Sequence, residues 1–165
     1  MIDNTDRRIL ALLQDDARMP VAEIARIIEL AASAVHLRIR KLEDAGVIQA
    51  YETRIDPRAV DRELVSFVRV RTGEGASAPE LNAALTSIPE VQEVHRVVGE
   101  DCFFVKVRVR GPEELADLLD HRLQRIPGVA STHTTIVLTT AKESFKLPLD
   151  VPENDQGPRL RAVSE

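Results

Sequence analysis

The stretch Ala31-Ala-Ser-Ala-Val-His-Leu-Arg-Ile-Arg-Lys-Leu-Glu-Asp-Ala45 decides the fold of the N-terminal part of the chain. Val35, Ile39 and Leu42 recur at i, i+4 and i+7, which is the spacing of one apolar helix face. A second short amphipathic stretch, residues 21–28, precedes it. Two short helices joined by a tight turn, the second of them basic, are typical of a helix-turn-helix that places its second helix in the DNA major groove.

The basic side chains of this stretch allow two interpretations. Arg38, Arg40 and Lys41 either contact DNA or form an ordinary solvated helix face. The surrounding charge does not decide between them, since residues 1–60 hold nine Lys or Arg and ten Asp or Glu, and the whole chain carries a net charge of −5. Any DNA affinity must therefore come from a local basic cluster, from helix N-termini facing phosphates and from doubling by dimerisation.

Length and composition exclude several classes of protein. A chain of 165 residues accommodates one ordinary domain or two small ones, and 44% apolar with 30% charged residues is typical of a soluble globular protein. No apolar run approaches the ~20 residues that a membrane helix needs, and the first residues lack the features of a signal peptide. We therefore expect a cytoplasmic protein with no membrane contact. The single cysteine, Cys102, excludes an internal disulfide framework.

The first 55 residues predict three helices closed by an extended strand. Asp3 is placed to cap the first helix through the backbone N–H of Asp6. Pro20 suits the start of the second helix, and Gly46 suits the end of the third, because glycine adopts positive φ freely. Residues 47–55 alternate between apolar and polar as a strand does. This order predicts a small DNA-binding module of the winged helix-turn-helix type.

The second half predicts the order βαββαβ. Strands are expected at residues 64–71, 91–98, 102–110 and 129–140, and helices at 78–88 and 112–126. An internal repeat supports two equivalent halves, because Ile88-Pro-Glu-Val91 returns as Ile126-Pro-Gly-Val129, 38 positions later. Two βαβ halves give a ferredoxin-like α+β fold with both helices on one face of a four-stranded antiparallel sheet.

The other face of that sheet is left uncovered by this arrangement. We expect it to show Phe104, Val94, Val98, Ile136 and Leu138 among basic residues. A half-apolar open face seldom stays exposed, so the domain should associate with another copy through this face or along its edges. After the last strand, residues 148–165 hold three prolines and scattered charge, which predicts a flexible tail.

Several motifs in the correct order carry a resemblance to one family. These are Asp3-x-x-Asp6-x-x-Ile9-Leu10-x-x-Leu13-x-x-Asp16-x-Arg18; Arg38-Ile39-Arg40-Lys41-Leu42-Glu43-x-x-Gly46-Val47-Ile48; Val98-Gly99-Glu100-Asp101; and Pro127-Gly128-Val129 with Thr132. They resemble the opening motif, the recognition helix and the effector-domain signatures of the Lrp/AsnC (feast/famine) family, over residues 2–147. Separate motifs in order are more specific than any one alone.

The resemblance implies a sequence-specific DNA-binding transcription regulator, with no enzymatic activity, no catalytic residues, no metal and no cofactor. Its domains would be a winged helix-turn-helix at residues 1–50, a linking strand and hinge at 51–62, a RAM ligand-binding and oligomerisation domain at 63–147, and the tail at 148–165. Its partners would be double-stranded DNA, a small amino-acid effector bound between subunits, and further copies of itself. These copies would form a dimer that assembles to an octamer.

The motifs also name the residues of the two expected sites. The DNA contacts are expected at Ser33, His36, Leu37, Arg38, Arg40 and Lys41. The ligand contacts are expected at Gly99, Glu100, Asp101, Cys102, Thr132 and Thr134, where threonine is also simply a good strand residue.

Four positions depart from the family pattern, one of them Leu37, which stands where a polar residue is common. Glu29 stands in the helix-turn-helix turn where glycine is usual, so either the turn differs or strain of ~1 kcal/mol is tolerated. Ala31 cannot cap the recognition helix, although Ser33 could if the helix began later. Cys102 stands where a second carboxylate would meet the ligand's ammonium group, a partner worth ~1.5–3 kcal/mol. The effector should differ in identity or pose or bind weakly, unless Glu100 or Asp101 replaces that carboxylate.

Other interpretations remain beside this one. The C-terminal domain could only assemble chains, which would make the protein an effector-independent architectural DNA-binding protein. Cys102 could be a nucleophile with His95 or His133 as its base, but a lone cysteine on a strand is more often a small core residue. His95 and His133 occupy matching places in the repeat and could bind a metal, although no third ligand is evident.

Overall fold

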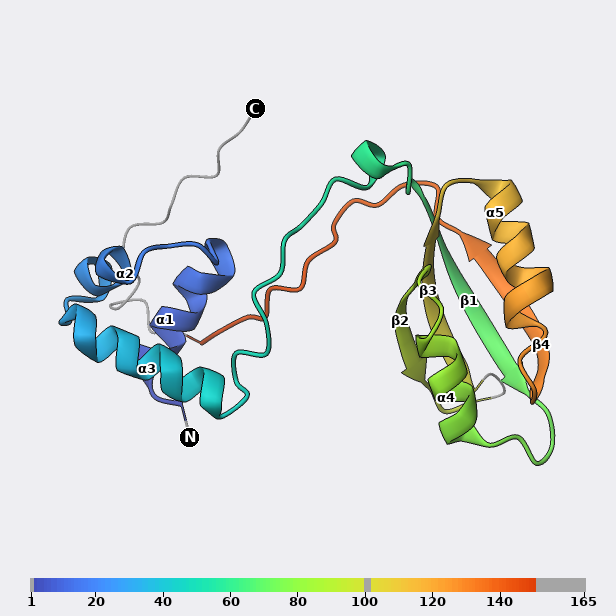
Figure 1. The fold of residues 1–165 in the computed structure, drawn as a ribbon, viewed down its shortest axis with the longest axis horizontal. Coiled ribbons are helices and arrows are strands. Elements are labelled where there is room, and N and C mark those ends of the chain that lie inside the picture. The colour runs from blue at the N-terminus through green and yellow to red at the C-terminus, as the bar shows by residue number, and fades with distance from the viewer. Residues whose placement is uncertain (1, 100–101, 151–165) are drawn as a thin grey trace. The chain divides into compact units, whose positions relative to one another are not determined.

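The computed structural model describes residues 2–99 and 102–150, which divide into two compact units. Of the described residues, 2–54 and 144–150 form the helical unit, and 55–99 with 102–143 form the sheet unit. The chain therefore crosses from the helical unit to the sheet unit once and then returns, as the two connecting stretches in Figure 1 show. Of the predicted tail, residues 151–165 lie outside the described residues, and residues 148–150 have no regular secondary structure.

The helical unit consists of α1 (Asn4–Asp15), α2 (Val21–Ile28) and α3 (Ala32–Asp44). A capping box begins α1, as predicted for Asp3: the N–H of Asp6 donates to Asp3 Oδ1 at 2.8 Å, and the N–H of Asp3 donates to Asp6 Oδ2 at 3.1 Å. The predicted apolar face of α3 is buried. The core of the unit consists of Ile9, Met19, Ile24, Ala25, Ile28, Val35 and Ile39.

The turn between α2 and α3 keeps its geometry without glycine. Glu29 adopts the left-handed conformation, with φ 60° and ψ 44°, so the strain expected for a residue with a Cβ is present here. Ala31 is the N-cap of α3 and makes no side-chain capping bond. Ser33 lies inside the first turn of α3, so the alternative in which it caps a later start is wrong.

The predicted strand at residues 47–55 is absent. Residues 49–56 have no regular secondary structure, and a short 3-10 turn, η1 (Pro57–Val60), follows them. Alternating apolar and polar side chains give a segment the sequence pattern of a strand. It forms a β-strand only when its backbone hydrogen-bonds to a neighbouring strand. Within the described part of this single chain, no strand pairs with the segment.

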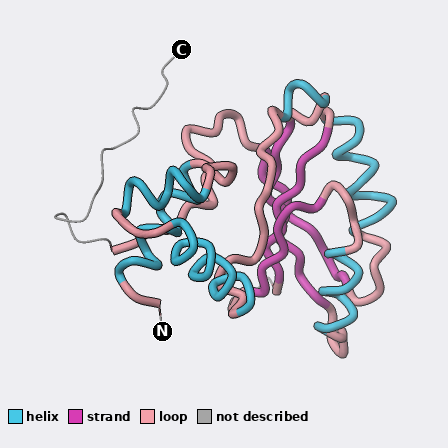
Figure 2. The backbone as a smooth tube through the Cα atoms, turned by 60° about the vertical axis from the view of Figure 1, so that its left-hand side comes forward, coloured by secondary structure: helices cyan, strands magenta, loops and turns pink. Residues whose placement is uncertain are grey.

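The sheet unit has the predicted ferredoxin-like α+β architecture. Its elements are β1 (Leu64–Thr72), α4 (Ala78–Thr86), β2 (Val91–Arg96), β3 (Phe103–Val109), α5 (Pro112–Asp117), which continues as the π-helical turn η2 (Leu118–Leu123), and β4 (Val129–Ile136). The strands pair antiparallel in the order β2-β3-β1-β4. Both helices lie on the same side of the sheet (Figure 2).

The main core lies between that side of the sheet and the helices, where alternate residues of β1 and β3 meet Leu81, Leu85, Leu115, Leu118 and Leu123. A bulge in β2 changes which residues face this core. Val91 pairs with Val107, but Glu93 pairs with Lys106, so Gln92 is an extra residue and Val94 turns toward the core. The expectation that Val94 lies on the open face is therefore wrong.

The prediction for the open face is also wrong at Ile136, on the opposite edge strand β4. Ile136 pairs with Ser66, whose partner on β3 is the core residue Val107, so Ile136 lies on the helix side. Phe104 does lie on the open face, where its ring stacks with that of Phe67 at a centroid distance of 5.3 Å. The open face is accordingly apolar around these two rings and strongly charged elsewhere.

Candidate functional site

Five of the six predicted DNA-contact residues lie on one exposed surface of α3. Ser33, His36, Leu37 and Arg40 follow the spacing i, i+3, i+4 and i+7, and Lys41 lies beside them. All five are exposed, and Leu37 keeps 56% of its surface accessible. An exposed helix face with two cations, an imidazole and a hydroxyl can donate hydrogen bonds to phosphates and base edges, and Leu37 can contact a thymine methyl group.

Arg38, the sixth residue, is engaged within the chain. Its Nη1 donates to Asp3 Oδ2 and to Asp6 Oδ1, both at 2.7 Å, and its side chain is 34% exposed. The N–H of Asp6 and then the Arg38 guanidinium lower the pKa of Asp3, and hydrogen bonds to Asp3 and Asp6 raise the pKa of Arg38. Arg38 therefore fastens the recognition helix to the capping box of α1, a pairing that helix periodicity does not signal.

A second contact holds the chain where it leaves α3. The hydroxyl of Tyr51 donates to Glu43 Oε1 at 2.9 Å. Although Tyr51 is 49% exposed, its partial burial and then the hydrogen bond to Glu43 raise its pKa to about 12. The phenol must stay protonated to donate this bond. Because its pKa is raised to about 12, it stays protonated, and the contact persists, at every pH near neutrality.

The predicted ligand residues lie around the loop between β2 and β3 and on β4. Gly99 has a φ of 145°, which favours glycine, and a Cβ there would have no atom of this chain within 4 Å. The backbone conformation, and not close packing within the chain, thus requires glycine at this position. Glu100 and Asp101 lie outside the described residues.

Cys102 and Thr132 flank the same residue at the end of β1. The N–H of Cys102 donates to the carbonyl of Val70 at 3.0 Å, and Thr132 pairs with Val70 from the other side. Cys102 Sγ lies 2.8 Å from Thr72 Oγ1, and Thr132 Oγ1 accepts a bond of 3.4 Å from Gln124 Nε2. The structure thus brings these two predicted residues to one end of the sheet.

Thr134 lies two residues along β4, opposite Val68, and is half-buried. Sequence reasoning missed the two partners, Thr72 and Gln124. Neither position carries a distinguishing pattern, because their contacts arise from strand pairing and from the end of the π-helical turn.

The two histidines considered for a metal or a catalytic base are far apart. His95 pairs with Phe104, Phe104 with Arg69, and Arg69 with His133, so the histidines lie in one row on opposite edge strands. Three strand spacings separate them by about 14 Å, too far for one metal ion. Within residues 2–99 and 102–150, no three His, Cys, Asp or Glu side chains are grouped to hold a metal, and the Cys102 thiol contacts a threonine.

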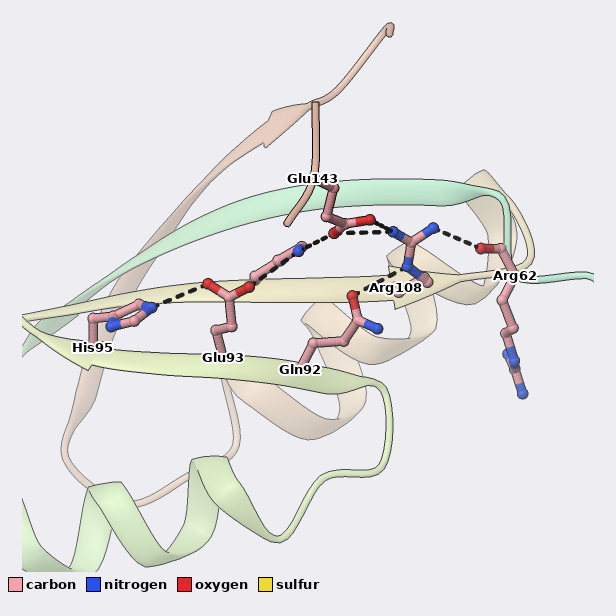
Figure 3. A network of polar contacts seen from close by, with 7 residues as sticks. Arg62, Gln92, Glu93, His95, Arg108 and Glu143 are labelled. Atoms are coloured by element: carbon pink, nitrogen blue, oxygen red, sulfur yellow. Dashed lines mark hydrogen bonds and ion pairs between the residues drawn. The ribbon is translucent and has the colours of Figure 1, made fainter. Parts of the chain in front are cut away.

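A charged network occupies the open face of the sheet (Figure 3). Lys106, only 9% exposed, donates to Glu93 at 3.0 Å and to Glu143. Arg108 donates to Glu143 at 3.0 Å and to Gln92 at 3.1 Å, and His95 lies 3.1 Å from Glu93. A buried lysine needs such partners, because an unpaired charge there would be strongly destabilising.

The pKa values in this network follow from these contacts. Lys106 lowers the pKa of Glu143 through its hydrogen bond, against the opposing effect of burial. Burial would lower the pKa of Lys106, but the hydrogen bonds to Glu143 and Glu93 outweigh it and raise the pKa. The lysine and the glutamates accordingly stay charged together.

A helix-turn-helix unit with an exposed recognition face, followed by a ferredoxin-like unit, defines a DNA-binding regulator of two domains. Residues 2–49 match the winged helix-turn-helix DNA-binding domain, and residues 65–147 match the Lrp/AsnC ligand-binding domain. The chain belongs to the Lrp/AsnC family of transcription regulators. It is 40% identical to the HTH-type transcriptional regulator FL11 of Pyrococcus horikoshii, over 90% of this chain and 97% of that protein.

Other relatives and solved structures agree with this assignment. The leucine-responsive regulatory protein of Escherichia coli is 34% identical, with 88% of this chain and 90% of that protein covered. The structure of Escherichia coli AsnC matches with a TM-score of 0.83 and 30% identity, covering 90% of this chain and 99% of that one. The feast or famine regulatory protein of Mycobacterium tuberculosis, solved with L-methionine, matches with a TM-score of 0.83 and 34% identity, covering 89% and 99%. None of the described helices is long and apolar enough to cross a membrane.

Proposed function

We propose that this regulator binds DNA sequence-specifically through α3 and that a small amino acid, bound between subunits of the sheet unit, modulates this binding. It acts in the cytoplasm, without catalytic activity, as a homodimer that assembles to an octamer. The observation that carries the proposal is the exposed face of α3, with Ser33, His36, Leu37, Arg40 and Lys41 at helical spacing. Two such helices in a dimer would lie about 34 Å apart, one turn of DNA, on a pseudo-palindromic site.

The double variant Arg40→Ala with Lys41→Ala tests the DNA surface. Each lost phosphate contact should reduce the slope of log affinity against log salt concentration by about 0.9, so affinity should fall at least tenfold at ~0.1 M salt. The variant Arg125→Ala with Lys142→Ala removes the same charge from exposed positions of the sheet unit. Equal affinity and equal salt slope in the two double variants would show that the α3 surface does not contact DNA.

The amino-acid effector is supported by the ligand-binding family of residues 65–147 and by relatives solved with L-methionine. Cys102 and Thr132 lie at one end of the sheet, where the predicted ligand loop also lies. Calorimetric titration with each of the twenty amino acids, L-methionine included, tests this part. Thr132→Val should weaken any binding detected, whereas Thr140→Val, at an exposed position after β4, should not.

One feature favours the alternative of an effector-independent architectural DNA-binding protein. The Cys102 thiol stands where a carboxylate would meet an ammonium group, and it already contacts Thr72 at 2.8 Å. If no amino acid at millimolar concentration gives heat or changes DNA affinity, while the α3 variants still lose affinity, the architectural function is correct.

A further inference from the structure

The chain that returns from the sheet unit makes specific contacts with the end of α1. Residues 144–150, named here the return segment, belong to the helical unit. Gln14 Nε2 donates to the carbonyl of Leu147 at 3.2 Å, and Gln14 Oε1 accepts from the N–H of Leu147 at 2.7 Å. One side-chain amide thus satisfies both backbone groups of one residue, as a neighbouring strand would do.

An ion pair next to this contact has a clear electrostatic reason. Lys146 Nζ lies 2.7 Å from Asp15 Oδ1. Asp15 is the last residue of α1, whose last turn holds no basic side chain, so its carboxylate faces the negative end of the helix dipole. Lys146 supplies the cation that the helix itself lacks at this end.

The contact with Gln14 uses the backbone of Leu147, and the side chains of Phe145 and Leu147 stay in solvent. Phe145 and Leu147 are 80% and 71% exposed, whereas Leu149, further along the segment, is half-buried. Three polar contacts hold the segment at Lys146 and Leu147, and they reach two adjacent residues of α1, Gln14 and Asp15. These contacts identify the end of α1 as a site for an extended segment with a lysine.

The residue just before the return segment is anchored in the sheet unit. Glu143 accepts hydrogen bonds from Lys106 and Arg108 on β3 (Figure 3). Only residues 144 and 145 separate this anchor from Lys146. Three residues of fully extended chain span no more than about 11 Å, so the two anchors can never separate by more than this length while both are held.

We propose that the end of α1 is a docking site for the return segment of the same chain. With Glu143 held at the other end, the docked segment is a second tether between the helical unit and the sheet unit, in addition to the predicted linking segment at residues 51–62. A change in the open-face network around Glu143 is thereby transmitted to the DNA-binding helices. The regulatory purpose of this tether rests on the proposed function, but the docking and the coupling do not.

Hydrogen exchange of the Leu147 amide, resolved by residue in the full-length protein, measures the docking directly. In Gln14→Ala the amide loses its acceptor and should exchange at least tenfold faster. Asn82→Ala removes an exposed side-chain amide from α4 and should leave the rate unchanged. A Leu147 amide that already exchanges at the rate of an unstructured peptide, or one that Gln14→Ala does not affect, overturns the docking.

A separate variant tests the coupling between Glu143 and the docked segment. Glu143→Gln removes the charge that Lys106 and Arg108 hold, without touching Gln14 or Asp15. The Leu147 amide should then exchange at least twofold faster, although its own partner is intact. An unchanged rate in Glu143→Gln, together with a faster rate in Gln14→Ala, overturns the coupling.

Zero-length carbodiimide cross-linking identifies which chain occupies the site. An amide bond between the Asp15 carboxylate and the Lys146 amine should form, should vanish in Lys146→Ala and should persist in Lys142→Ala. A cross-linked product of the mass of one chain supports docking within the chain. A product of the mass of two chains, or no Asp15–Lys146 product, overturns it.

Discussion

Glu29 holds the turn between α2 and α3 with a φ of 60°, in a region that glycine occupies at little cost. Replacing it with glycine removes the steric cost of the Cβ, about 1 kcal/mol, while part of this gain is lost to the greater freedom of glycine in the unfolded chain. We expect Glu29→Gly to raise the free energy of unfolding by about 0.5 kcal/mol, measured by urea denaturation. Glu29→Ala keeps the Cβ and should give no such gain; a gain of equal size would show that the φ is not the cause.

Tyr51 is the single tyrosine of a chain without tryptophan, so absorbance near 295 nm reports on this residue alone. Its pKa is raised to about 12 by burial and by the bond to Glu43. Because the neutral phenol is favoured in the folded state, the contact stabilises the protein fully below the ordinary pKa near 10, and this stability is lost as pH rises toward 12.

Spectrophotometric titration should therefore give a midpoint near 12 in the native protein and near 10 in concentrated urea. Glu43→Gln should lower the native midpoint by removing the carboxylate, while burial continues to raise it. A native midpoint near 10 would show that the Tyr51 hydroxyl is not held by Glu43.

At the scale of elements, the clamp of Arg38 on the capping box joins α1 to α3. The pKa of Asp3 is lowered in the folded state, so its contribution to stability is fully present above the unfolded pKa near 4 and is lost as pH falls through the folded value. Arg38→Gln should flatten the fall in stability between pH 5 and about pH 3, as measured by urea midpoints. Arg40→Gln removes the same charge from an exposed neighbour and should keep the pH dependence of the unmodified protein. Identical profiles of stability against pH in the two variants would show that Arg38 does not stabilise the Asp3 carboxylate.

Sequence periodicity predicted the type and order of nearly all elements, because each long element buries one face. It placed β1 at residues 64–71 and the structure places it at Leu64–Thr72. It failed at Val94, because one extra residue in β2 reverses the alternation and no local signal marks the bulge. It failed at residues 47–55, because an alternating segment becomes a strand only when another strand pairs with it.

The candidate site was predictable where side chains share one helix face and less so where they meet across the fold. The exposed row from Ser33 to Lys41 follows from helical spacing alone. The engagement of Arg38 with Asp3 and Asp6 joins residues 35 and 32 positions apart, so periodicity within one helix cannot reveal it. The same holds for Lys106 on the open face, because its partner Glu143 lies 37 positions away.

At the scale of the whole molecule, charge limits what one chain does alone. The net charge is −5, and one of the three cations of α3 is neutralised by two aspartates. Only Arg40 and Lys41 of these cations are then available to contact phosphates. The electrostatic part of DNA affinity grows with the number of phosphate contacts, so a single chain should bind weakly. Linking two such surfaces turns the second contact into an intramolecular event and can raise affinity by 10²–10⁴. DNA binding should therefore depend on association of copies.

We expect the open face of the sheet to be the surface for this association, since Phe67 and Phe104 stack there beside the charged network. Phe104→Asp introduces a charge into this apolar patch and should dissociate the assembly to monomers, as seen by sedimentation velocity. DNA affinity should fall at least a hundredfold, because each monomer then binds with one helix only. Ala83→Asp adds the same charge at an exposed position of α4 and should change neither mass nor affinity.

The mass of the assembly and the DNA affinity should therefore change together in Phe104→Asp. Circular dichroism must first show that Phe104→Asp keeps its helices and strands, so that lost affinity reflects lost association. If the variant sediments as a monomer and still binds DNA with the affinity of the unmodified protein, a single α3 surface suffices. The weak charge of the helical unit would then be no obstacle, and association would serve the ligand site alone. If the variant keeps its original mass, the copies associate through another surface, and the apolar patch of Phe67 and Phe104 is not their contact.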